Sequence, residues 1–298
     1  MARTDLSPAH RITMLKTKRF YGKGIPKVVL DELKGQLIVV EGADGSGRST
    51  QIDLLRNWLE RRGYPTVNVG LKRSMLVSRE LEQAMRGNIL GTRTLSLFYA
   101  TDFADQLENR IIPALRSGFI VLADRYIYTL MSRAIVRGVE PAWIRDVYSI
   151  ALIPDAVFYL AVSPRILVER NLRKHAVLDY WESGMDMHRS PNMYGNFIEY
   201  QRQIQKEFKV MQEHYGFETI NGNRSPRAIQ NELRAKIGAI LNGKSGLTEL
   251  TDEGSNDSNR TERIARSVTA LANGDKRDQP AVRGQSAARH RTTDRVSE

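Results

Sequence analysis

A glycine-rich segment, Gly42 to Ser49, contains the residue types that bind phosphate groups. It reads Gly-Ala-Asp-Gly-Ser-Gly-Arg-Ser and fits the pattern G-x-x-x-x-G-K-[ST], except that Arg48 stands at the lysine position. Glycines let backbone N–H groups point inward at phosphate oxygens, and a helix beginning near Ser49 presents its positive end to the same anion. The Ser49 hydroxyl can ligate Mg²⁺, and a cation at position 48 can bridge the β- and γ-phosphates. The segment predicts a nucleoside triphosphate site, with a ligand-free turn as the alternative.

Arginine at position 48 keeps the charge of lysine but changes its shape. Lysine is a compact point charge, whereas guanidinium is a wider, planar fork that is more weakly hydrated. Such a fork can hold phosphates through two hydrogen bonds, or it can tilt the nucleotide and slow the transfer. We therefore expect nucleotide binding and leave the effect of Arg48 on the reaction rate open.

The segments around this loop predict an alternation of short apolar strands and helices. We expect strands at residues 37–40, 66–69, 119–122, 157–160 and 217–220, and helices at 49–62, 95–115, 141–152, 196–215 and 226–241. Apolar strands separated by helices predict an α/β fold, with a parallel five-stranded sheet covered by helices on both faces. In such a sheet the ligand lies beyond the carboxyl ends of the strands, where the glycine-rich segment falls.

Composition excludes several classes of protein. The chain has 298 residues and no cysteine, which rules out disulfides, a thiolate nucleophile and cysteine-ligated metal. It contains no run of the roughly 18–20 apolar residues that a membrane span requires, and its N-terminus does not resemble a secretory signal. We expect a soluble, cytoplasmic protein without a membrane partner. Its net charge of +11 predicts an anionic partner.

The charge distribution divides the chain into three parts. Residues 1–36 form a basic extension with 8 basic and 3 acidic groups, 37–243 form the main domain, and 244–298 form a polar tail with 10 basic and 9 acidic groups. The tail lacks aromatic residues and is predicted to be disordered. In the extension, lysines alternate with aromatic residues, a pattern that can hold single-stranded nucleic acid. We favour the alternative, in which its apolar residues pack on the domain, and do not expect nucleic acid as a partner.

Four segments, in order, resemble the thymidylate kinase family. Glu41 to Gln51 is similar to the family's phosphate loop, E-G-x-D-G-x-G-K-[ST]-T-Q, with one substitution. Arg93 to Leu115 resembles the helix that carries the family's base-stacking aromatic, Asp124-Arg125-Tyr126 matches its D-R-Y, and Pro154 to Arg170 resembles the lead-in to its lid. The resemblance covers residues 37–242. It implies a P-loop NTPase fold with a short lid.

The activity implied by this resemblance is phosphoryl transfer from ATP to a nucleoside monophosphate with Mg²⁺, most directly from dTMP to dTDP. The family positions assign ATP binding to Gly42, Ala43, Asp44, Gly45, Ser46, Gly47, Arg48, Ser49 and Thr50. They assign acceptor binding to Asp44, Arg73, Tyr99, Phe103 and Arg125, and catalysis to Arg48, Asp124, Arg125, Arg170 and Arg173. Mg²⁺ is assigned to Ser49 and Asp124, directly or through water. Lys174 joins the lid cations, while Asn223 and Arg224 fall where the family contacts adenine.

Departures from the family fall on acceptor recognition. The R-E-P-G-G segment after the second strand is replaced near Gly70 to Ser74, the family's thymine-reading arginine falls at Phe103, and its Y-Q pair falls at Arg133-Ala134. Thymine as the base is therefore left open, because a pocket built on hydrogen bonds depends strongly on its polar groups. The alternatives are another nucleotide or nucleoside as acceptor, or a nucleotide-binding regulatory protein with weak catalysis because of Arg48. A homodimer is also left open.

Overall fold

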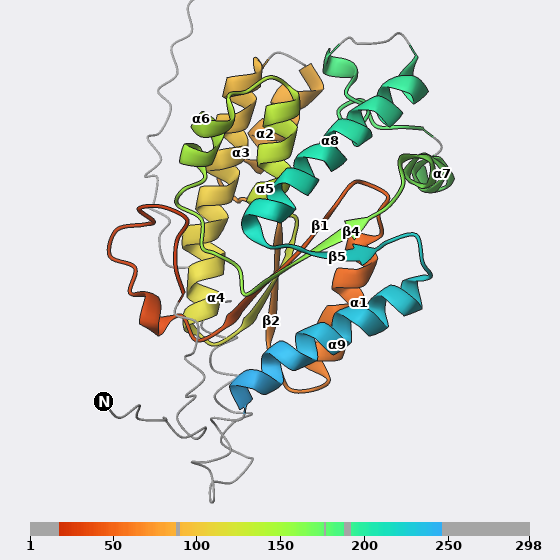
Figure 1. The fold of residues 1–298 in the computed structure, drawn as a ribbon. Coiled ribbons are helices and arrows are strands. Elements are labelled where there is room, and N and C mark those ends of the chain that lie inside the picture. The colour runs from red at the N-terminus through yellow and green to blue at the C-terminus, as the bar shows by residue number, and fades with distance from the viewer. Residues whose placement is uncertain (1–17, 88–89, 176, 188–191, 246–298) are drawn as a thin grey trace, which may run out of the picture. The chain divides into compact units, whose positions relative to one another are not determined.

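A parallel sheet of five strands forms the centre of the molecule (Figure 1). The strands lie in the order β2 (Thr66–Gly70), β3 (Ile120–Asp124), β1 (Gln36–Gly42), β4 (Ala156–Ala161) and β5 (Glu218–Asn221). This computed structural model describes residues 18–87, 90–175, 177–187 and 192–245, which belong to one compact unit. The predicted α/β fold with its parallel five-stranded sheet is confirmed.

Helices cover both faces of the sheet (Figure 1). In β1, Ile38 and Val40 point to the face covered by α1 (Arg48–Glu60) and α9 (Pro226–Ser245). Leu37 and Val39 alternate with them and point to the opposite face. That face is covered by α3 (Thr92–Gln106), α4 (Ile112–Arg116), α5 (Ile127–Val136) and α8 (Met193–Tyr215). Because both faces are covered, β1 is apolar at consecutive positions rather than at alternate ones.

Three further helices complete the described part of the fold. They are α2 (Ser78–Gly87), α6 (Pro141–Val147) and α7 (Pro164–His175). The sequence analysis did not predict α2 or α5, and its helix at 141–152 ends at Val147 instead. The helix predicted at 95–115 is α3 followed by a π-helical turn, Leu107–Ile111, and then α4. Pro113 has no N–H to donate to the carbonyl four residues earlier, which explains the wider turn before it.

The described part of the N-terminal extension packs against the domain. Phe20 forms an antiparallel bridge with Leu152, and the Ile153 N–H donates to the Arg19 carbonyl over 2.8 Å. Tyr21 packs edge-on against Tyr128, with ring centroids 6.4 Å apart. Residues 1–17 of the extension lie outside the described residues. The predicted disordered tail also lies outside them, except for residues 244 and 245, which end α9.

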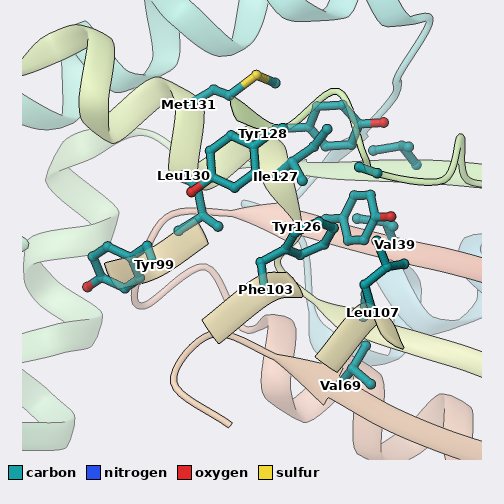
Figure 2. Close-up of a cluster of buried hydrophobic side chains, with 14 of the residues drawn as sticks. Val39, Val69, Tyr99, Phe103, Leu107, Tyr126, Ile127, Tyr128, Leu130 and Met131 are labelled. Carbon is teal, nitrogen blue, oxygen red and sulfur yellow. The ribbon is translucent and has the colours of Figure 1, made fainter. Parts of the chain in front are cut away.

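Aromatic side chains fill the core between the sheet and the helices of the α3 face. Figure 2 shows Phe103 beside Tyr126, and their ring centroids are 5.2 Å apart in an edge-on arrangement. Tyr148 contacts the same Phe103 ring at 5.8 Å. This layer locks α3 and α5 onto the carboxyl half of the sheet. Within the parts of the chain that the structure describes, no helix has the length and apolar character needed to cross a membrane.

Candidate active site

The phosphate loop connects the carboxyl end of β1 to the first turn of α1. Gly45 and Gly47 adopt φ angles of +82° and +92°, which side chains other than glycine rarely tolerate. A Cβ atom on Gly45 would also lie 2.7 Å from the amide nitrogen of Asn171 on α7. Asn171 donates in turn to the Asp44 carbonyl over 3.0 Å, which ties the loop to α7. The glycines therefore permit both the curl of the loop and the close approach of the lid helix.

The Arg48 side chain folds back into the phosphate loop and is only 5% exposed. Its Nε donates to Asp124 Oδ1 over 2.9 Å, and one terminal nitrogen donates to the carbonyl oxygens of Gly42 and Ala43. The other terminal nitrogen donates to Asp44 Oδ1 over 3.3 Å. All three nitrogen atoms of the guanidinium are thus engaged by protein oxygens. Burial alone would lower the pKa of Arg48, but Asp124 and Asp44 raise it, so the residue stays charged.

Asp124 ends β3 and lies beside the start of α1. Its Oδ2 accepts a hydrogen bond from the Ser49 hydroxyl over 2.9 Å, while its Oδ1 accepts from Arg48. Burial favours the neutral acid, but Arg48 and Arg125 outweigh it and hold the pKa of Asp124 below its ordinary value. A carboxylate and a hydroxyl at this spacing fit Mg²⁺, which takes hard oxygen ligands together with substrate phosphates and water. Among the described residues, no cluster of three or more acidic or histidine side chains offers an alternative metal site.

A buried glutamate next to the loop anchors α5. Glu41 accepts hydrogen bonds from the backbone N–H groups of Tyr126 and Thr129 and from the Thr129 hydroxyl. These donors lie at the N-terminus of α5, where a carboxylate is stabilised by the helix dipole. Between Asp124 and this helix, Arg125 adopts a φ angle of +72°. Strained arginine backbone of this kind persists only where the surroundings hold it, and such positions cluster at functional sites.

Four charged side chains form a ring of alternating sign beside the phosphate loop. Arg125 pairs with Asp44, and Arg133 on α5 pairs with Glu182. Cross-contacts close the ring: Arg125 lies 3.8 Å from Glu182 and Arg133 lies 3.6 Å from Asp44. Burial raises the pKa of Glu182 to about 7, with Arg133 opposing and Asp44 adding to the shift. Burial would also raise the pKa of Asp44, but Arg125 and a hydrogen bond from Glu182 bring it well below its ordinary value.

The loop after β2 is held by α3 rather than by a proline turn. Asp102 accepts the backbone N–H groups of Lys72 and Ser74 over 2.9 and 2.8 Å. Gln106, one turn later, exchanges two hydrogen bonds with the backbone of Gly70. These contacts direct Arg73 toward Asp124, and the two side chains lie 4.0 Å apart.

A cleft of about 910 Å³ runs over the carboxyl ends of the strands. The phosphate loop, Asp124 and Arg125 line one part of it, and cations from the lid helix, Arg170 and Lys174, line another. A second, smaller cavity of about 30 Å³ has mainly apolar walls and shares Met85, Tyr99, Arg133 and Trp181 with the cleft. We call these two cavities the cleft and the apolar pocket.

Most of the predicted site residues come together in the cleft. Those that line it are Ala43, Asp44, Gly45, Gly47, Arg48, Ser49, Thr50, Arg73, Tyr99, Asp124, Arg125, Arg170 and Lys174. Ser46 is buried within the loop, where its hydroxyl lies 3.4 Å from the Arg48 guanidinium. Gly42 ends β1 and accepts from Arg48. Their roles toward ATP, Mg²⁺ and the acceptor remain predictions.

Phe103 and Arg173 are predicted site residues that lie outside the lining of the cleft, and their roles remain predictions. Phe103 is 5% exposed and packs in the aromatic core, because α3 turns this face toward Tyr126 and Tyr148. Arg173 is 76% exposed and pairs with Glu169 on the outer face of α7. Both lie outside the set of residues that line the two cavities described above.

The two residues predicted at the adenine site have partners outside the cleft lining. Asn223 accepts the Ser163 N–H over 3.1 Å, and Arg224 pairs with Glu232. They lie after β5, as expected from the sequence, but among the described residues neither lines the cleft.

Sequence reasoning missed the side chains that connect α5 to the segment between α7 and α8, which we call the lid segment. Arg133 lies on α5 and Arg137 follows its last residue, four positions later, and their partners Glu182 and Asp186 also lie four residues apart. Trp181, beside Glu182, walls both cavities. The matched spacing of two arginines and two acids was visible in the sequence, but the pairing partners lie 49 residues apart.

Comparison with known proteins places these observations in a family. The family model described as Thymidylate kinase matches residues 40–232. A probable thymidylate kinase 2 of Saccharolobus solfataricus is 36% identical over 210 residues, which are 70% of this chain and 98% of that relative. A thymidylate kinase of Caldicellulosiruptor saccharolyticus is 34% identical over 188 residues, 58% of this chain and 86% of the relative. A probable thymidylate kinase of Thermococcus kodakarensis is 27% identical over 214 residues, which are 68% of this chain and 98% of that relative.

Proposed function

The chain belongs to the thymidylate kinase family, and we propose that it transfers the γ-phosphoryl group of ATP to dTMP, which gives ADP and dTDP. The observation that carries this proposal is the continuous cleft, which joins the phosphate loop to the face formed by Tyr99 and Trp181. Donor and acceptor can meet in one such space. The bond between the γ-phosphorus and the bridging oxygen breaks as the acceptor phosphate oxygen attacks, so the protein's task is positioning and charge neutralisation.

The donor phosphates bind at the phosphate loop. Its backbone N–H groups and the positive end of α1 face the cleft, and glycines at 45 and 47 allow that geometry. Arg170 and Lys174 from α7 line the same cleft and supply positive charge there. Ser49 and Asp124 would hold Mg²⁺, directly or through water. When bound, the ion would supply positive charge that neutralises the transferring phosphate groups.

Arg48 acts on this site mainly through Asp124. Because all three of its nitrogen atoms donate to protein oxygens, its guanidinium stabilises the loop and fixes the carboxylate beside Ser49. Charge neutralisation of the phosphates then falls on the cations that line the cleft with fewer protein contacts. With Arg48 acting on Asp124 and other cations neutralising the phosphates, kinase activity does not require a lysine at position 48.

The acceptor phosphate binds at Arg125 and Arg73, next to Asp124. The positive φ angle of Arg125 turns its side chain back over the loop toward Asp44. Tyr99, on α3, offers a ring for the acceptor base at the boundary of the cleft and the apolar pocket. A regulatory protein with weak transfer is the second candidate, and the engagement of Arg48 by protein oxygens is the observation that favours it.

A panel of acceptors tests the proposal. The purified protein is incubated with ATP, Mg²⁺ and each of dTMP, dUMP, dCMP, dGMP and dAMP, and ADP formation is followed. We expect dTMP to support the fastest turnover, and Asp124→Asn to lower kcat by at least about 100-fold. Asp53→Asn, a matched change on the exposed face of α1, is expected to leave kcat unchanged. ATP binding without turnover on any monophosphate would favour the regulatory candidate instead.

A further inference from the structure

Arg133 lies at the junction of the two cavities. It comes from α5 and lines both the cleft and the apolar pocket. The other residues at this junction are Met85, Tyr99 and Trp181, which present apolar or aromatic surface. The junction of the two cavities therefore offers apolar and aromatic surface for a planar ring such as a nucleobase, together with one charged group, Arg133.

The ion pairs of the Arg133 guanidinium use only one of its three nitrogen atoms. Its NH2 nitrogen pairs with Glu182 Oε1 and lies 3.6 Å from Asp44 Oδ2. Both contacts run through this one nitrogen, whereas a guanidinium carries five N–H donors on three nitrogens. The side chain is fixed in place and keeps donor capacity for a ligand atom.

Comparison with Arg137, which follows the last residue of α5, separates this arrangement from a purely structural one. Arg137 forms two hydrogen bonds with Asp186, over 2.8 and 3.0 Å, and donates to the Tyr200 hydroxyl over 2.6 Å and the Trp181 carbonyl over 3.0 Å. All three of its nitrogens are in use, and it lines only the apolar pocket. Arg137 anchors the lid segment, and Arg133 faces the space where the acceptor binds.

The charge around Arg133 indicates which ligand atom it suits. Above the pKa of Glu182, the charge of Arg133 is balanced by Glu182 and the charge of Arg125 by Asp44, so the ring of four side chains then has no excess charge. A paired guanidinium of this kind favours a neutral acceptor atom over a second anion. The neutral acceptors on a nucleobase are carbonyl oxygens and unprotonated ring nitrogens.

We propose that Arg133 recognises a carbonyl oxygen on the acceptor base and thereby selects oxo-pyrimidine over amino-pyrimidine nucleotides. An exocyclic amino group at that place would set donor against donor and leave buried polar groups unpaired, which is a strong basis for discrimination. Arg133 is a specificity-determining residue, and Glu182 is the positioning residue that orients its fork. The inference rests on the proposed function, because it concerns the acceptor of that same site.

Substitution of Arg133 in the full-length protein tests this inference. We compare the wild type with Arg133→Gln, Arg133→Lys and the matched surface control Arg145→Gln, an exposed position on α6. For each we measure kcat/KM for dTMP, dUMP and dCMP, the KM for ATP, the melting temperature, and calorimetric binding of the three monophosphates.

We expect Arg133→Gln to lower kcat/KM for dTMP and dUMP by about 10- to 100-fold. The kcat/KM for dCMP should change much less. The preference for dTMP over dCMP should shrink while the KM for ATP stays constant. Arg133→Lys retains the charge but lacks the planar guanidinium, so it should also reduce the preference for dTMP over dCMP. This second variant provides the test if Arg133→Gln fails to fold. Arg145→Gln should match the wild type.

An equal loss for all three acceptors, or an unchanged preference, would overturn the inference, because Arg133 would then serve the phosphate or the fold. Failure of the wild type to phosphorylate any monophosphate would refute the proposed function alone. In that case the calorimetry still decides: a dTMP preference that Arg133→Gln removes supports the inference, and equal or absent binding of dTMP and dCMP overturns it.

Discussion

At the scale of single residues, arginine in place of lysine at position 48 changes which groups in the phosphate loop this cation contacts. A lysine ammonium is a point charge on a flexible stem, whereas the guanidinium can donate in several directions at once. Arg48 uses that capacity on Asp124, on Asp44 and on two loop carbonyls. The site is built around the fork, so the residue at 48 is coupled to the position of Asp124.

We therefore expect Arg48→Lys to lower kcat by about 10- to 100-fold rather than to restore a faster enzyme. A single ammonium cannot reach Asp124 and the two loop carbonyls together, so Asp124 and the loop lose their present geometry. Steady-state kinetics with ATP and dTMP, together with the melting temperature, measure the effect. A rate equal to or above that of the wild type would show that the guanidinium merely replaces lysine.

At the scale of elements, the lid segment between α7 and α8 depends on α5 for its position. Arg133 on α5 and Arg137, just past its end, bind two acids four residues apart on the segment, and Arg137 also donates to the Trp181 carbonyl. Glu182 is the attachment that faces the cleft, surrounded by Arg133, Arg125 and Asp44. Burial raises its pKa from the usual 4.5 to about 7, so the folded chain keeps a proton that the unfolded chain releases.

This pKa predicts how stability depends on pH. Between pH 4.5 and about 7 the native state binds more protons at Glu182 than the unfolded state, so its contribution to the free energy of unfolding falls as the pH rises. Urea denaturation of the wild type and Glu182→Gln across this range measures the contribution by difference. The wild type should lose stability with rising pH more steeply than the variant. Parallel pH profiles would contradict a raised pKa at this position.

At the scale of the whole molecule, the N-terminal extension is joined to the domain by a buried ion pair. Lys18 pairs with Asp155 at the start of β4, and the two side chains are 5% and 11% exposed. Asp155 also accepts the Leu37 N–H over 2.7 Å, so the pair connects the extension to β1 and β4. The apolar residues Phe20, Tyr21 and Ile25 pack on the same core. The division of the chain at residues 36 and 243 stays a prediction, but residues 18–36 share the core of the domain.

Removal of this buried charge should destabilise the fold. Lys18→Ala removes the cation that pairs with Asp155, and we expect a loss of about 3 kcal/mol in the free energy of unfolding. Lys23→Ala changes an exposed lysine of the same extension and is expected to stay within about 0.5 kcal/mol. Chemical denaturation of both variants gives the comparison. Equal stabilities would show that the ion pair adds nothing to the attachment.

The sequence by itself determined the sheet, the phosphate loop and the family. Short apolar runs such as 37–40 are local signals of buried parallel strands, and the glycines at 45 and 47 are local requirements of the loop backbone. The resemblance of four ordered segments indicated the kinase family that the comparisons then confirmed. These features are encoded in neighbouring residues, so a single sequence reveals them.

Only the tertiary structure decided which side chains meet in the cleft. Phe103 falls at the position of the family's thymine-reading arginine, and the rotation of α3 buries it against Tyr126. Arg133 falls at the first position of the family's Y-Q pair without matching it, and α5 carries it to the boundary of the two cavities and to Glu182, 49 residues further along the chain. Spacing within one helix predicts which residues share a face. Which way that face points depends on packing against the sheet and the neighbouring helices, and those long-range contacts decide which side chains line the cleft.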